Sequence, residues 1–303
     1  MNTTIDSVKL NFNNDSLWVL NFCLAIIMFG VALNLSLDDF RNVLKTPKAS
    51  LVGVVSQFVL LPALTFILIW IVEPQPSIAI GMMMVAACPG GNISNFMSHL
   101  SRANVALSVS LTAISTVLAI FMTPLNLKLW ASLYPPTASL LHEVRLDNME
   151  VFKAVGILLG VPLILGMTFR QWKPAIAERL SNWLKPVSIL IFIGFVVIAF
   201  SNNLDIFLEY FQYIIFIVFI HNGVAFMSGF FFARLAGLSL LDQKAITIET
   251  GIQNSGLGLL LIFTFFQGLG GMAIVAAWWG IWHIISGLTL SFFWSRTKPL
   301  VAL

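Results

Sequence analysis

Long apolar stretches separated by short polar segments dominate the hydropathy pattern of the chain. A helix needs roughly 20 apolar residues to cross a hydrocarbon core of about 30 Å, and such stretches can be placed nine times. We therefore predict an all-α polytopic membrane protein with nine transmembrane helices. Their expected ranges are 17–35, 49–73, 77–100, 104–133, 150–170, 184–203, 208–236, 242–266 and 271–294.

The basic residues predict the orientation of these spans, because cytoplasmic loops carry an excess of Lys and Arg. With the N-terminus outside, 12 of the 16 basic residues fall on the cytoplasmic side. Residues 1–16 would then form an extracytoplasmic tail and residues 295–303 a cytoplasmic tail. No long linker interrupts the series, so we expect 17–294 to form a single transmembrane unit in a cell (inner) membrane.

Composition supports this class of protein and argues against several others. The chain is 58% hydrophobic and 10% charged, with a mean hydropathy of +0.93, whereas soluble domains are about a quarter charged. A net charge of +3, spread over many loops, gives no reason to expect a nucleic-acid partner. The sequence also lacks a phosphate-binding Gly-Lys-Ser/Thr motif, and we expect neither an enzyme nor a bound cofactor.

Two of the expected spans contain residues that interrupt helices near mid-depth. The third contains CPGG at 88–91, and the eighth contains ETGIQNSG at 249–256. Irregular backbone at this depth is tolerated only where it is buried in protein or lines a cavity. The two spans run in opposite directions, as in inverted repeats whose broken helices meet at a midplane site. Repeats of five helices would leave the first half one helix short, giving a four-plus-five arrangement.

Glu249 is the most informative residue in these interruptions. A carboxylate at mid-span costs about 2.5–3.5 kcal/mol on insertion scales and usually marks a functional site. Ser108 and Thr112 lie four residues apart, so they share one helix face. Hydroxyl oxygens beside a carboxylate suit a hard cation, although the two hydroxyls taken alone are better explained by hydrogen bonding between helices.

Other polar residues in apolar surroundings extend this list. Asn92, Ser94 and Asn95 follow the first break, and Gln57 and Gln253 are further neutral oxygen donors. The spans also contain His221, Asn222 and His283, and each of the two histidines fits either a proton-sensitive ligand or ordinary packing.

Taken together, these motifs resemble those of the bile acid:sodium symporter family, which includes bacterial homologues of the intestinal and hepatic bile acid transporters. The resemblance extends from IMFG at 27–30 to WH at 282–283. Its strongest segments are CPGGNISN at 88–95, NVALS at 104–108, HNG at 221–223 and TIETGIQNSG at 247–256.

The resemblance implies two crossed discontinuous helices, a core domain of spans 49–133 and 208–294, a panel domain of spans 17–35 and 150–203, and a substrate crevice between the domains. By residue, the first implied sodium site consists of Ser94, Asn95, Ser108, Thr112 and Glu249. The second consists of Gln57, Glu249, Gln253 and the carbonyls of Thr250 and Ile252. The implied substrate-facing residues are Asn92, Asn254 and His283.

Charge balance then predicts the substrate class. Two sodium ions that share one carboxylate leave about one positive charge, which an anion near half-helix N-termini could offset. We expect symport of an organic anion, bile-acid-like or a small pantoate-type acid, by alternating access. The expected partners are this anion, sodium ions and membrane lipid, with no obligate protein partner. Proton coupling through Glu249 and His283, and a channel, remain alternatives. Asn92 stands where bacterial relatives commonly have threonine, which leaves the substrate open.

Overall fold

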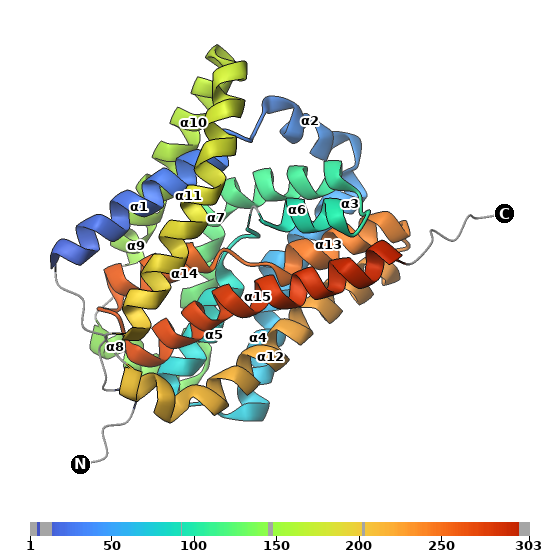
Figure 1. Cartoon of the computed structure of the whole chain (residues 1–303). Coiled ribbons are helices and arrows are strands. Elements are labelled where there is room, and N and C mark those ends of the chain that lie inside the picture. Colours follow the sequence, from blue (N-terminus) through green and yellow to red (C-terminus); the bar gives the residue numbers. More distant parts are fainter. Residues whose placement is uncertain (1–4, 7–13, 92, 145–147, 202–203, 297–303) are drawn as a thin grey trace.

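The computed structural model describes residues 5–6, 14–91, 93–144, 148–201 and 204–296, which are helical with short connections and form no β-strand (Figure 1). The fold class predicted from hydropathy is therefore confirmed at the level of an all-helical protein. The helices are α1 (Asn14–Ala32), α2 (Leu37–Lys45), α3 (Pro47–Val55), η1 (Ser56–Leu60), α4 (Leu61–Val72), α5 (Pro76–Ala87), α6 (Ile93–Leu100), α7 (Val105–Leu133), α8 (Pro135–Val144), α9 (Asn148–Val155), η2 (Gly156–Gly160), α10 (Val161–Trp172), α11 (Pro174–Ser201), α12 (Leu204–Leu235), α13 (Leu240–Gly251), α14 (Ser255–Phe265) and α15 (Gly270–Arg296).

Several of these helices are long and apolar enough to cross a membrane. Among the described residues, four continuous stretches meet both criteria, namely Pro47–Val72, Val105–Leu133, Leu208–Leu235 and Gly270–Arg296. Shorter apolar helices occupy Pro76–Ala87, Gly156–Trp172 and Ser255–Phe265. The chain is thus a multi-pass membrane protein, while the count of nine spans stays a prediction.

The two expected interruptions separate short helices from one another. The expected span 77–100 consists of α5 and α6, and the expected span 242–266 consists of α13 and α14. The second interruption is shorter than predicted, because α13 continues as a helix to Gly251 and α14 begins at Ser255. Glu249 therefore lies in the last turn of a helix and not in the irregular segment.

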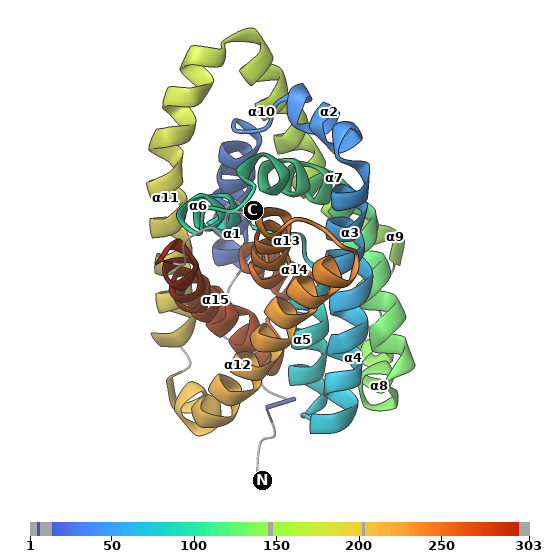
Figure 2. The ribbon, with the colours of Figure 1, turned by 90° about the vertical axis from the view of Figure 1, so that its right-hand side faces the viewer.

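Helix α5 occupies the centre of the packed structure. Every residue from 77 to 87 is buried, as expected for a helix that is apolar on all faces. It contacts α4, α7, α14 and α15, while α1 packs against α10, α11 and α14. In Figure 2, α11 stands at the edge of the molecule opposite α3 and α4.

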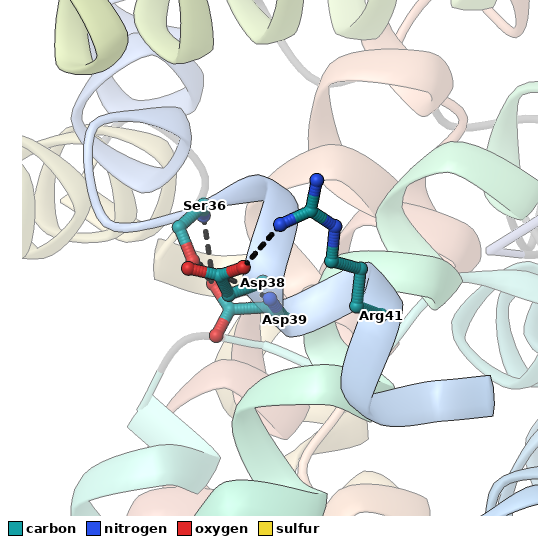
Figure 3. A network of polar contacts seen from close by, with 4 residues as sticks. All are labelled: Ser36, Asp38, Asp39 and Arg41. Carbon is teal, nitrogen blue, oxygen red and sulfur yellow. Dashed lines mark hydrogen bonds and ion pairs between the residues drawn. The ribbon is translucent and has the colours of Figure 1, made fainter. Parts of the chain in front are cut away.

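A short amphipathic helix, α2, lies between the first two expected spans (Figure 3). Its start is fixed by a capping box in which Ser36 Oγ accepts from the Asp39 backbone N–H and the Ser36 N–H donates to Asp39 Oδ2. Arg41 pairs with Asp38 at 3.0 Å, but both side chains are exposed. Such a pair contributes little stability, so the capping contacts and the packing of Phe40 in an apolar cluster with Ala113 define this helix.

Candidate cation site at two helix breaks

The two interrupted segments are joined directly through their backbones. Gly90 and Gln253 form an isolated antiparallel bridge. The Gly91 N–H donates to the Ile252 carbonyl at 2.9 Å, and the Asn254 N–H donates to the Pro89 carbonyl at 2.8 Å. Each break thus satisfies backbone groups of the other, which buried irregular backbone requires in a membrane.

Side chains from neighbouring helices satisfy the last helical carbonyl before each break. Thr123 Oγ1 of α7 donates to the Ala87 carbonyl at 2.7 Å. Asn222 Nδ2 of α12 donates to the Gly251 carbonyl at 2.8 Å. Buried carbonyls without partners cost free energy, so these two contacts stabilise the ends of α5 and α13.

Hydroxyl groups from two helices converge on the carboxylate of Glu249. Its Oε1 accepts hydrogen bonds from Ser94 on α6 and from Ser108 and Thr112 on α7, with distances of 2.6 Å for Ser108 and 3.0 Å for Thr112. Asn95 Oδ1 accepts from the same two α7 hydroxyls, at 2.9 and 3.2 Å. The five residues implied for a first sodium site therefore lie together, and ion binding by them stays a prediction.

A proline places Gln57 beside this cluster. Pro62 has no N–H, so it cannot donate to the Phe58 carbonyl four residues earlier, and the helix widens into the π-turn η1. Asn126 Nδ2 donates to that carbonyl at 3.0 Å. Such π-turns are frequent at functional sites, and this one carries Gln57, whose side chain is fully buried.

A second group of oxygens surrounds Gly90. Gln57 Oε1 accepts from the Gly90 N–H at 3.3 Å. A Cβ atom added to Gly90 would lie 2.7 Å from Glu249 Oε2, 3.2 Å from the Glu249 carbonyl and 3.5 Å from Gln57 Oε1. Gly90 is thus packed so closely against oxygen atoms of Glu249 that no side chain fits at this position.

Unpaired buried atoms mark the same region. Gln57 Nε2 and Gln253 Oε1 are both buried without a hydrogen-bond partner. The Thr250 carbonyl accepts from Gln253 Nε2 at 2.7 Å, and the Ile252 carbonyl accepts from the Gly91 N–H. A carbonyl oxygen has two lone pairs, so each of these carbonyls has capacity for one further contact. The residues implied for a second sodium site are therefore gathered at the crossing.

The three residues implied to face a substrate have different surroundings. Asn92 lies outside the described residues. Asn254 is half-buried and caps α14, because its Oδ1 accepts from the Leu257 N–H at 3.0 Å. His283 is 5% exposed on α15, and its Nδ1 has no hydrogen-bond partner. Their roles toward a substrate stay predictions.

The other polar residues of the spans differ in their relation to the breaks. His221 Nε2 is 2.7 Å from Thr65 Oγ1, and its ring packs against Trp279 with centroids 4.7 Å apart, which fits the packing alternative. Asn222 contacts a break through the Gly251 carbonyl and also accepts from Ser286 Oγ at 2.6 Å. Of His221 and Asn222, only Asn222 contacts a helix break directly.

Sequence reasoning missed three supporting residues. Ser56 Oγ lies 2.8 Å from Thr250 Oγ1 and links η1 to α13, while Thr123 and Asn126 satisfy freed carbonyls. A signal for the last two was available, because both flank Pro124 within an apolar span.

The chemistry of the donors indicates the kind of ligand that the site would hold. The set consists of one carboxylate with hydroxyl, amide and carbonyl oxygens. No group of three or more His, Cys, Asp or Glu side chains that could hold a metal occurs among the described residues. Oxygen donors with a single carboxylate suit a hard cation and do not suit zinc or copper.

The fold and the site together define a class: a multi-pass membrane protein with an oxygen-lined, carboxylate-bearing site at paired helix breaks. A sequence model of the sodium bile acid symporter family matches residues 21–210. The chain belongs to the sodium bile acid symporter family, which consists of transporters and not enzymes, so the family resemblance is confirmed.

Relatives from distant organisms support this assignment. YocS of Bacillus subtilis (strain 168), described as an uncharacterized sodium-dependent transporter, is 35% identical over 292 residues, covering 95% of this chain and 88% of YocS. BASS1 of Arabidopsis thaliana, a probable sodium/metabolite cotransporter of chloroplasts, is 30% identical over 91% of this chain and 66% of its own length. The human ileal sodium/bile acid cotransporter is 31% identical over 79% of this chain and 67% of its own length.

Proposed function

We propose that the protein is a sodium-coupled symporter that carries an organic anion by alternating access. The observation that carries this proposal is the fully buried Glu249 carboxylate, on which hydroxyls converge at the meeting point of two helix breaks. No basic side chain of the described residues forms an ion pair with it. A sodium ion would supply the missing positive charge, and the relatives named as sodium-dependent carriers support the choice of this ion.

Two sodium ions would share Glu249. The first would use oxygens of Ser94, Asn95, Ser108 and Thr112, and the second would use Gln57, Gln253 and the carbonyls of Thr250 and Ile252. The unpaired Gln253 Oε1 and the close approach of Gly90 to oxygens of Glu249 and Gln57 support the second position. The hydroxyls that donate to Glu249 in this arrangement would turn their oxygen lone pairs toward the ion when it binds.

The substrate would be an anion, because two sodium ions and one carboxylate leave about one positive charge near the N-termini of α6 and α14. The names of relatives, which include metabolite and bile acid cotransporters, support an organic acid. Asn92, Asn254 and His283 would face it. Rocking of a core against a panel, organised as inverted four-plus-five repeats, would then expose the site to each side in turn.

The helices of the proposed panel, α1, α10 and α11, contact one another, and within the proposed core α12 packs on α13 and α15 packs on α5. The panel also packs on the core, where α1 contacts α14 and where α9 and η2 contact α7. The proposed orientation places the N-terminus outside. It would be refuted if tags at the N-terminus and after residue 298 were reached from the same side of intact cells.

Transport in proteoliposomes tests the function. Labelled organic acids are offered to purified protein under an inward sodium gradient, with an equal potassium gradient as the control. We expect saturable accumulation of at least one acid under sodium only. Accumulation driven equally well by a proton gradient without sodium, or flux that never saturates, would contradict the proposal.

A further inference from the structure

Lys244 on α13 is a buried cation without a carboxylate partner. Lys244 is 6% exposed, and no described carboxylate forms an ion pair with its side chain. Instead, its Nζ donates to the Ser101 carbonyl at 3.3 Å and to the Trp294 carbonyl at 3.4 Å. The ammonium also lies 5.6 Å from the centroid of the Trp294 ring, within the range of a cation–π contact.

Both carbonyls belong to helix C-termini. Ser101 directly follows α6, and Trp294 lies in the last turn of α15. The C-terminal end of a helix has carbonyls without intrahelical partners and a partial negative charge. Lys244 therefore satisfies the ends of two helices from a third and joins α6, α13 and α15 at a single point.

The helices α6 and α13 also provide opposite sides of the Glu249 cluster. They contact each other, and Ser94 on α6 donates to Glu249 on α13. Lys244 precedes Glu249 by five residues, about 7.5 Å along the helix axis. At the other end of the cluster, the Gly91 N–H donates to the Ile252 carbonyl. The two helices are thus joined on both sides of the cluster.

A second contact reinforces the joint at the Lys244 end. Asn104, which follows the turn after α6, donates from Nδ2 to Asp242 Oδ1 at 2.7 Å, and its backbone N–H donates to the Leu241 carbonyl at 3.1 Å. The turn between α6 and α7 is therefore attached to the first turn of α13. Lys244 is the buried, charged member of this set of contacts.

We propose that Lys244 is a positioning residue for the first sodium site. It holds α6 against α13, so that Ser94 and Glu249 keep their spacing before the ion binds, and the ion does not have to order them. Such preorganisation raises affinity by lowering the cost of binding. This inference rests on the proposed sodium-coupled function.

The test compares Lys244→Met, which keeps length but removes charge, with Lys244→Arg, which keeps the cation. We expect Lys244→Met to raise the sodium concentration for half-maximal uptake about tenfold or more, the factor expected for a lost hydrogen bond to a charged group. The maximal rate at saturating sodium should remain, and arginine should restore most of the affinity. Lys48→Met is the matched control, because Lys48 is exposed on α3, and its sodium requirement should not change.

A double-mutant comparison separates positioning from general stability. Lys244→Met combined with Ser108→Ala should cost less than the sum of the single changes, whereas its combination with Gln57→Ala should be additive. Thermal stabilisation of the protein by sodium alone provides a second readout that needs no substrate. If Lys244→Met does not yield folded protein, Lys244→Gln takes its place in the same comparisons.

Three results would count against the inference. A lower melting temperature of Lys244→Met with an unchanged sodium requirement would overturn it, because the residue would then be purely structural. Additivity with Ser108→Ala would do the same. If the wild-type protein itself showed no response to sodium, the proposed function would fail, and this inference would fail with it. The first two results would overturn only the role of Lys244 and leave the proposed function standing.

Discussion

Replacing Gly90 with alanine would press a methyl group against the oxygen atoms of Glu249. The added Cβ would lie 2.7 Å from Glu249 Oε2 and 3.2 Å from the Glu249 carbonyl. Ordinary van der Waals contact begins at 3.4 Å, so the carboxylate oxygen would have to move by about 0.7 Å. Because Glu249 is held by three hydroxyls, such a movement would disturb the other contacts of the cluster.

The expected magnitude follows from this overlap. Forcing an extra methyl group into a packed interior costs about 1–3 kcal/mol, and a change of this size corresponds to a factor of about 5 to 150 in affinity. We expect Gly90→Ala to raise the sodium concentration for half-maximal uptake by a factor in this range, because the methyl group would displace the Glu249 oxygens proposed to bind the second ion.

Gly91→Ala is the matched control. A Cβ on Gly91 would have its nearest contact at 3.5 Å, to the Gln253 carbonyl, so we expect little effect. Sodium-dependent uptake in proteoliposomes and sodium-induced shifts in melting temperature would be measured for both variants. Equal sodium requirements for Gly90→Ala and the wild type would refute the placement of an ion beside residue 90.

Two further predictions concern packing and backbone satisfaction. Gly166→Ala should lower the melting temperature in detergent, because the added Cβ would lie 2.5 Å from Ala32 Cβ, where α10 meets α1. Gly194→Ala is the control and should not lower it, because no atom lies within 4 Å of its added Cβ. Equal melting temperatures of the two variants would argue against this close helix contact. Asn126→Leu should destabilise the protein by about 1–3 kcal/mol, because it leaves the buried Phe58 carbonyl without its partner. An unfolding midpoint equal to that of the wild type would show that the π-turn does not depend on this contact.

The sequence predicted the two helix breaks well because their causes are local. CPGG at 88–91 contains a proline and two glycines, and 249–256 combines glycines with polar residues. The extent of the second break was overestimated, because Glu249, Thr250 and Gly251 remain helical while Asn222 satisfies the terminal carbonyl. That contact comes from a helix about 30 residues away in sequence, and no local pattern reports it.

The surroundings of Gln57 could not be predicted from hydropathy. Pro62 removes a backbone donor, but a proline inside a span has more than one structural outcome: α7 continues through Pro124 and α11 through Pro186, whereas the helix at Pro62 forms a π-turn. At Pro62 the freed Phe58 carbonyl accepts from Asn126 of another helix, a contact between residues far apart in sequence. Spacing likewise placed Ser108 and Thr112 on one face, but their contact with Glu249 depends on how α7 packs against α13.

The central claim is that the Glu249 carboxylate holds the coupling ions. Glu249→Gln keeps the size and much of the hydrogen-bonding capacity of the side chain but removes its charge. The decisive measurement is sodium-gradient-driven uptake by this variant in proteoliposomes, with correct folding verified by its melting temperature. We predict that the folded variant shows no sodium-driven uptake. Uptake with the same sodium dependence as the wild type would show that the carboxylate is structural and would contradict the account.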